Sequence, residues 1–119
     1  MNSRALVHLF HILIVGGLFL YVGINKEKIY KPLFNILLFL GFVIIFYHLY
    51  KIYVYLNAGK GIWVNLIHVF IVGPLLVYIG YTGEKTARKF FEILLMLGFS
   101  SIGYHLHYLI EIIKASTNT

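Results

Sequence analysis

The stretch HILIVGGLFLYVG, from His11 to Gly23, decides the fold that this sequence predicts. It is apolar apart from its first residue and one tyrosine, and it returns as HVFIVGPLLVYIG, from His68 to Gly80, at an offset of 57 positions. Self-similarity at a fixed spacing is the sequence signature of an internal repeat. The stretch therefore predicts one apolar helix that the chain uses twice.

The composition extends this pattern to the whole chain. Of the 119 residues, 61% are hydrophobic and 12% are charged, whereas soluble domains have about 25% charged residues. A helix needs about 20 apolar residues to cross a membrane. The sequence predicts a one-domain, all-α integral membrane protein with four transmembrane helices, at Ala5–Ile24, Pro32–Leu56, Ile62–Tyr81 and Phe90–Ile113. The first segment is interpreted as a helix rather than a signal peptide, because its second copy lies in mid-chain.

Polar and special residues also recur at the offset of 57, outside the quoted stretch. Glu27-Lys28 aligns with Glu84-Lys85, and Tyr47-His48-Leu49 aligns with Tyr104-His105-Leu106. Each copy holds two spans, so both copies enter the membrane from the same side, as in transporters with parallel repeats. We predict two tandem helical hairpins, residues 1–57 and 58–119.

Glycine and proline mark the turns and the packing positions. Gly23 and Gly80 are predicted to end the first helix of each hairpin, and Pro32 fits the first turn of the following helix. Small residues let helices approach closely, and Pro74 stands where the first copy has Gly17. That shared interruption indicates either a packing kink or a nearby binding site. The predicted packing positions are Gly16, Gly41, Gly73, Pro74 and Gly98.

Four histidines lie inside the predicted spans. At 1.5 Å per residue, His11 and His48 differ in height by about 7 Å, and the same holds for His68 and His105. Histidine is rare inside membrane helices and its ring nitrogens need partners there. Four rings at one level, in corresponding positions of two copies, predict a shared intramembrane site.

Metal ligation is the leading interpretation of this site. Imidazole is a common ligand of transition metals and an axial ligand of haem. His11 with His68, or His48 with His105, would hold one haem b iron from opposite sides, or all four rings would surround one metal ion. The predicted role is electron transfer.

Two other interpretations stay open. The histidines would fix helix packing by hydrogen bonds to carbonyls or to Tyr47 and Tyr104, which would make the protein a structural scaffold. Alternatively, the rings and tyrosines would form a proton or ion relay. His8 and His107 have no histidine counterparts and are assigned to the membrane interface. No hydrolytic motif occurs, so hydrolytic chemistry has no support in the sequence, and whether the protein is an enzyme stays open.

Charge and cysteine content limit the possible partners. The absence of cysteine excludes disulfides and covalent c-type haem. The ten Lys and Arg residues are spread over the termini and the connections, which is typical of lipid headgroup contacts and not of nucleic-acid binding. Six of them flank the hairpin turns and four lie on the other side, which predicts termini on the non-cytoplasmic side. The six residues near the turns are Lys26, Lys28, Lys31, Lys85, Arg88 and Lys89, and the other four are Arg4, Lys51, Lys60 and Lys114.

A homo-oligomer or another membrane protein as partner stays open.

The repeat unit also resembles a group of viral proteins. Its pattern is His-x3-Val-Gly-[Gly/Pro]-Leu-x2-Tyr-x-Gly, followed by Leu-Gly-x5-Tyr-His-Leu. In these positions the chain is similar to short multi-pass membrane proteins encoded by large DNA viruses of algae and protists. The resemblance covers most of the chain and implies a virion or host-membrane location. It implies no activity, cofactor or catalytic residue.

Overall fold

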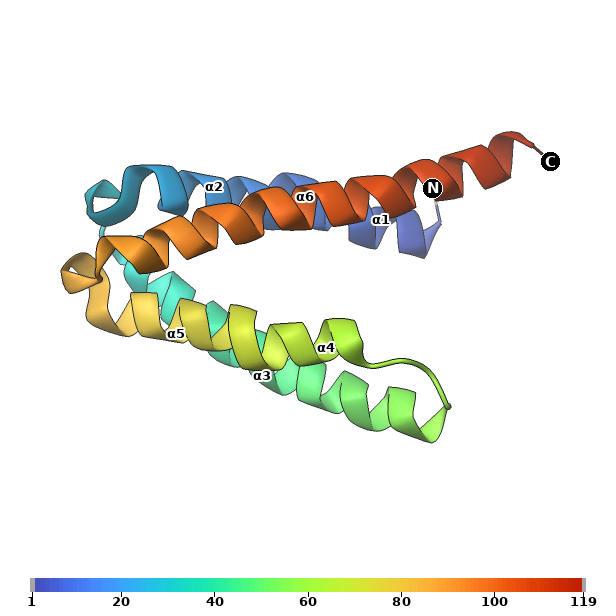
Figure 1. Cartoon of the computed structure of the whole chain (residues 1–119), viewed down its shortest axis with the longest axis horizontal. Helices are drawn as coiled ribbons and strands as arrows, with labels where there is room; N and C mark the ends of the chain where they lie inside the picture. The colour runs from blue at the N-terminus through green and yellow to red at the C-terminus, as the bar shows by residue number, and fades with distance from the viewer. Residues whose placement is uncertain (1, 119) are drawn as a thin grey trace. The chain divides into compact units, whose positions relative to one another are not determined.

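The computed structural model describes residues 2–118, which form helices joined by short turns. The first long helix comprises α1 (Ser3–Phe10), the π-helical turn η1 (His11–Val15), α2 (Gly16–Asn25) and the 3₁₀ turn η2 (Lys26–Lys28). It is followed by α3 (Pro32–Asn57). The third comprises α4 (Trp63–Ile67), the π-helical turn η3 (His68–Val72), α5 (Gly73–Thr82) and the 3₁₀ turn η4 (Gly83–Lys85). The last is α6 (Arg88–Thr117), shown in orange to red in Figure 1.

These helices confirm the prediction of four apolar helices of membrane-spanning length. Segments long and apolar enough to cross a membrane run over Ser3–Lys28, Pro32–Asn57, Trp63–Lys85 and Arg88–Thr117. No strand occurs among residues 2–118. Pro32 begins α3, as predicted, because the first turn of a helix does not need the N–H that proline lacks.

The chain forms two compact units. Unit 1 combines the residues up to Lys26 with those from Phe91 onward, and unit 2 is Glu27–Phe90. In unit 1 the helix containing α1 and α2 packs on α6, and in unit 2 the helix containing α4 and α5 packs on α3 (Figure 1). Each unit therefore takes one helix from residues 1–57 and one from 58–119. The tandem hairpin arrangement stays a prediction.

Glycines allow the two helices of each unit to approach closely. A Cβ atom added to Gly23 would lie 2.8 Å from the Cα of Leu95, and one added to Gly80 would lie 2.7 Å from the Cα of Leu38. Real Cβ atoms do not come this close to a neighbouring backbone. Leu95 stands 57 positions after Leu38, so the two units repeat the same close contact.

The other predicted packing glycines also face the neighbouring helix of their own unit. A Cβ atom on Gly16 would lie 2.5 Å from Ile102, and one on Gly73 would overlap Ile45. A Cβ atom on Gly41 would lie 2.8 Å from the carbonyl oxygen of Gly73, whereas one on Gly98 would lie 3.1 Å from the Cβ of Phe19. Pro74, by contrast, is exposed.

The predicted helix ends at Gly23 and Gly80 are wrong by two residues. The helices continue to Asn25 and Thr82, and the positive φ that ends them falls on the next residue in each case. That residue is Lys26 in unit 1 (φ 58°) and Gly83 in unit 2 (φ 58°). Gly23 and Gly80 are needed for close packing rather than for helix termination.

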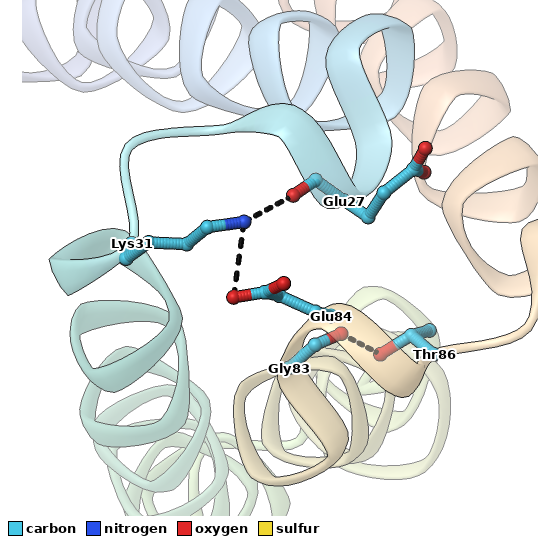
Figure 2. A network of polar contacts seen from close by, with 5 residues as sticks. All are labelled: Glu27, Lys31, Gly83, Glu84 and Thr86. Carbon is cyan, nitrogen blue, oxygen red and sulfur yellow. Dashed lines mark hydrogen bonds and ion pairs between the residues drawn. The ribbon is translucent and has the colours of Figure 1, made fainter.

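Hydrogen bonds and an ion pair order the turns of unit 2, as Figure 2 shows. The ammonium of Lys31 donates to the backbone carbonyl of Glu27 at 2.7 Å and lies 3.1 Å from the carboxylate of Glu84. The hydroxyl of Thr86 donates to the carbonyl of Gly83 at 2.7 Å. Because the side chains of the ion pair are more than half exposed, the pair contributes at most about 1 kcal/mol.

Candidate functional site

The two π-helical turns begin at predicted site residues, His11 in η1 and His68 in η3. The N–H of Gly16 donates to the carbonyl of His11, and the N–H of Gly73 donates to that of His68, each over five residues. Pro74 has no N–H to offer the carbonyl four residues earlier, and glycine is a weak helix former. Both features favour a widened turn at this point. Such turns often occur at functional sites.

In unit 2, two of the predicted histidines stack face to face. The ring of His48 on α3 lies on that of His68, with centroids 4.0 Å apart and planes inclined by 15°. The Nδ1 atom of His68 lies 2.8 Å from the carbonyl oxygen of Val64 on its own helix. The Nδ1 atom of His48 lies 2.8 Å from the side-chain oxygen of Asn65 on the neighbouring helix. Asn65 is buried, with 5% of its surface exposed.

Unit 1 repeats this arrangement with one residue exchanged. The ring of His105 on α6 stacks on that of His11, with centroids 4.3 Å apart and planes inclined by 24°. The Nδ1 atom of His11 lies 2.8 Å from the carbonyl oxygen of Val7. The Nδ1 atom of His105 lies 2.8 Å from Nδ1 of His8, and His8 stands 57 positions before Asn65. A buried histidine, His105, thus bonds to imidazole in one unit where its counterpart bonds to a carboxamide in the other.

These bonds determine where the protons lie on the rings. A carbonyl oxygen only accepts, so His11 and His68 carry a proton on Nδ1 and donate it to Val7 and Val64. His48 likewise donates from Nδ1 to the Asn65 oxygen. In a neutral ring with a proton on Nδ1, the lone pair is on Nε2. An Nδ1–H bond to a carbonyl is also the usual way in which metal-binding histidines are oriented.

The predicted site residues are thus brought together in two pairs, each contained in one unit. His11 contacts His105, and His48 contacts His68. The predicted haem pairs, His11 with His68 and His48 with His105, each draw one residue from each unit and stay a prediction. Tyr47 and Tyr104 contact the histidine next to them edge-on, with centroids 5.2 and 5.1 Å apart.

Sequence reasoning missed two residues of the site, His8 and Asn65. His8 was assigned to the membrane interface, but it bonds His105 and its ring also stacks on Tyr108, with centroids 5.9 Å apart. The available signal was spacing, because His8 and Asn65 each stand three residues before a site histidine, on the same helix face. His107 is exposed, and its ring contacts Tyr108 edge-on.

The stacked geometry limits what each pair can bind. Axial ligands of one haem lie on opposite sides of the iron, so two face-stacked rings cannot serve as such a pair in this arrangement. One metal ion would need both Nε2 atoms within about 4 Å of each other, because each bond to imidazole is about 2.0–2.1 Å long. The lone pair of each Nε2 lies in its ring plane, so the two rings would have to tilt out of this stack to point at one ion. Among residues 2–118, no group of three or more His, Asp or Glu side chains is arranged to hold a metal ion.

Comparisons with protein-family models, with curated proteins and with solved structures find no match for this chain. The resemblance to viral membrane proteins therefore stays a prediction.

Proposed function

We propose that this protein is a multi-pass membrane protein, built from two tandem repeats, that binds a transition metal through its intramembrane histidines. The ligands are His11 and His105 in unit 1 and His48 and His68 in unit 2, each acting through Nε2. The role proposed for the bound metal is electron transfer.

The observation that carries this proposal is the common use of Nδ1. All four rings engage Nδ1 in a hydrogen bond, at 2.8 Å in each case. A carbonyl or carboxamide oxygen accepts three of these bonds, which leaves the lone pair of His11, His48 and His68 on Nε2. Ring orientation and tautomer are the two properties that the surroundings of a metal-binding histidine normally set.

The repeat and the membrane location are supported by contacts and exposure. The glycine contacts, the stacked rings and the π-helical turns of unit 1 recur in unit 2 at the offset of 57. Large apolar side chains point outward, for example Phe39, 72% exposed, and Phe70, 71% exposed. Contact with lipid would be favourable for these apolar side chains, whereas exposure to water would be unfavourable.

A metal ion fits each pair better than haem does. Two rings stacked at 4.0 or 4.3 Å would need only a tilt to direct both Nε2 lone pairs at one ion, whereas haem would have to enter between them. Haem b held by one histidine of each unit is the alternative form of the proposal. The two forms differ in their visible spectrum and in the number of metal atoms per chain.

A structural role is the second candidate, and hydrogen bonds between helices favour it. His48 bonds Asn65, and His105 bonds His8, each linking the two helices of a unit. Such bonds contribute about 0.6 kcal/mol on average in a membrane protein, which would help to fix the packing of the two helices. This role requires neither metal nor haem.

Measurements on purified protein distinguish metal binding, the structural role and the proton relay. The chain should be produced in haem-replete and metal-replete cells, and its metal content and visible spectrum recorded. Ligation predicts bound metal that His48→Ala or His68→Ala reduces, while His107→Ala, outside the pairs, retains it. A Soret band would assign haem. Metal-free, colourless protein whose histidine variants lose only thermal stability would support the structural role. Metal-free protein that conducts protons in liposomes, unless His48 is replaced, would support the relay.

A further inference from the structure

We infer that Asn65 and His8 are positioning residues that hold the Nδ1 proton of His48 and of His105, so that Nε2 of each ring carries the lone pair. The inference rests on the proposed function for its purpose, but the tautomers themselves can be measured without any metal. Neither Asn65 nor His8 is a ligand in this proposal.

The carboxamide of Asn65 fixes its partner because of its burial and its chemistry. It is 5% exposed, so water does not replace it easily as an acceptor. Its oxygen lies 2.8 Å from Nδ1 of His48, and a carboxamide oxygen can only accept a hydrogen bond. The proton must therefore lie on Nδ1 of His48. The neutral ring of a histidine side chain in water prefers its proton on the other nitrogen, Nε2, so Asn65 works against the intrinsic preference of the ring.

His8 occupies the same place in unit 1 but offers an imidazole nitrogen. The two Nδ1 atoms lie 2.8 Å apart, so one ring donates and the other accepts. The equivalent bond in unit 2 runs from the histidine of α3 to Asn65. By this equivalence His105 donates and His8 accepts. Stacking on Tyr108 holds the ring of His8 in the orientation that this requires.

Because His8 and Asn65 occupy corresponding positions of the two units, each is a conservative substitution for the other. His8→Asn gives unit 1 the residue of unit 2, and Asn65→His does the reverse. Both keep an acceptor for the Nδ1 proton. Asn65→Leu and His8→Leu remove the acceptor at similar volume. If an acceptor is what matters, the Asn and His exchanges should preserve the tautomer and the leucine variants should not.

Nitrogen-15 NMR of histidine-labelled protein in metal-free detergent micelles is the direct test. Signals are assigned with single His→Ala variants, and a protonated ring nitrogen is distinguished from an unprotonated one by its chemical shift. We expect His48 and His105 to show protonated Nδ1 and unprotonated Nε2. Asn65→Leu should move the proton of His48 to Nε2, and His8→Leu should do the same to His105. His8→Asn and Asn65→His should leave both patterns in place.

Two results would overturn the inference. One is an unchanged His48 pattern in folded Asn65→Leu protein. The other is a His8→Asn variant that alters His105 as much as His8→Leu does. Binding of added Zn²⁺ tests the link to the proposed function separately, with an expected loss of affinity of roughly 10- to 100-fold in Asn65→Leu. If the tautomers change as expected but wild-type protein binds no Zn²⁺, the proposed function fails and the positioning role stands.

Discussion

The imidazole ring of His48 lies parallel to that of His68, with 4.0 Å between centroids and 15° between planes. Two positive charges about 4 Å apart repel by about 4 kcal/mol at an effective dielectric constant near 20. Placing a charge on both rings at once is therefore unfavourable. The neutral pair is the form that a metal ion would bind, because only neutral imidazole is a metal ligand.

Close packing at Gly80 predicts a loss of stability on substitution. In Gly80→Ala, the new Cβ would lie 2.5 Å from the backbone nitrogen of Leu38, so the helices of unit 2 must move apart. We expect a destabilisation of about 1–3 kcal/mol, measured by thermal unfolding in detergent. Gly17→Ala is the matched control, since nothing lies within 4 Å of its Cβ. It should be neutral or slightly stabilising because alanine is the better helix former. Equal unfolding temperatures for the two variants would contradict this packing.

Backbone strain predicts a second effect, at Gly83. Its φ of 58° and ψ of −131° are a combination that residues with a Cβ atom rarely adopt. Gly83→Ala should cost about 1–3 kcal/mol, although the nearest atoms to the new Cβ are 3.9 Å away. Gly61→Ala, in open space and without a positive φ, should change stability by less than about 0.5 kcal/mol. If Gly83→Ala unfolds like the parent, the turn has a different backbone conformation.

A disulfide can test the helix pairing in unit 1, because the chain has no cysteine of its own. A Cβ atom at residue 98 would lie 3.1 Å from the Cβ of Phe19, close to the 3.5–4.5 Å range of a disulfide. We expect Phe19→Cys with Gly98→Cys to form a cross-link on oxidation. Proteolysis at a site inserted near Lys60 would reveal it, because the fragments stay joined. Gly17→Cys with Gly98→Cys should not cross-link. Cross-linking of the control pair alone would exclude this pairing.

The four helices could be predicted from the sequence, but the pairing of helices could not. Apolar length and Pro32 were enough to place the helices, because both act locally. By contrast, local signals do not decide which two helices pack together. Leu38 and Leu95 are identical at corresponding positions of the two repeats, as are Ile45 and Ile102. A first-repeat helix thus finds almost the same packing surface on α3 and on α6, and the sequence pattern alone does not distinguish them.

The histidine site was predicted in part for a similar reason. Symmetry singled out His48 and His105, since both copies keep them. The same criterion removed His8 and Asn65, because their side chains differ. Yet both form a hydrogen bond with Nδ1 of a site histidine, so a comparison of hydrogen-bonding groups would have kept them. The π-helical turns were predicted only as an interruption at Gly17 and Pro74, because these residues weaken the helix without specifying how its backbone widens.

Membrane topology gives a prediction that does not depend on metal. If all four apolar helices cross the membrane, both termini lie on the same side, and the charge distribution predicts the non-cytoplasmic side. Tags at each end, tested for accessibility in intact cells, should report the same compartment. Tags on opposite sides would contradict four full crossings and with them the tandem repeat.

In the proposed function, imidazole nitrogen binds a transition metal inside the helix units. Electron paramagnetic resonance of protein loaded with Cu²⁺ tests this most directly, because ligand nitrogen splits the copper signal. We expect nitrogen coupling that weakens in His68→Ala and in His105→Ala and persists in His107→Ala. Copper that shows no nitrogen coupling, or coupling that only His107→Ala removes, would contradict the claim.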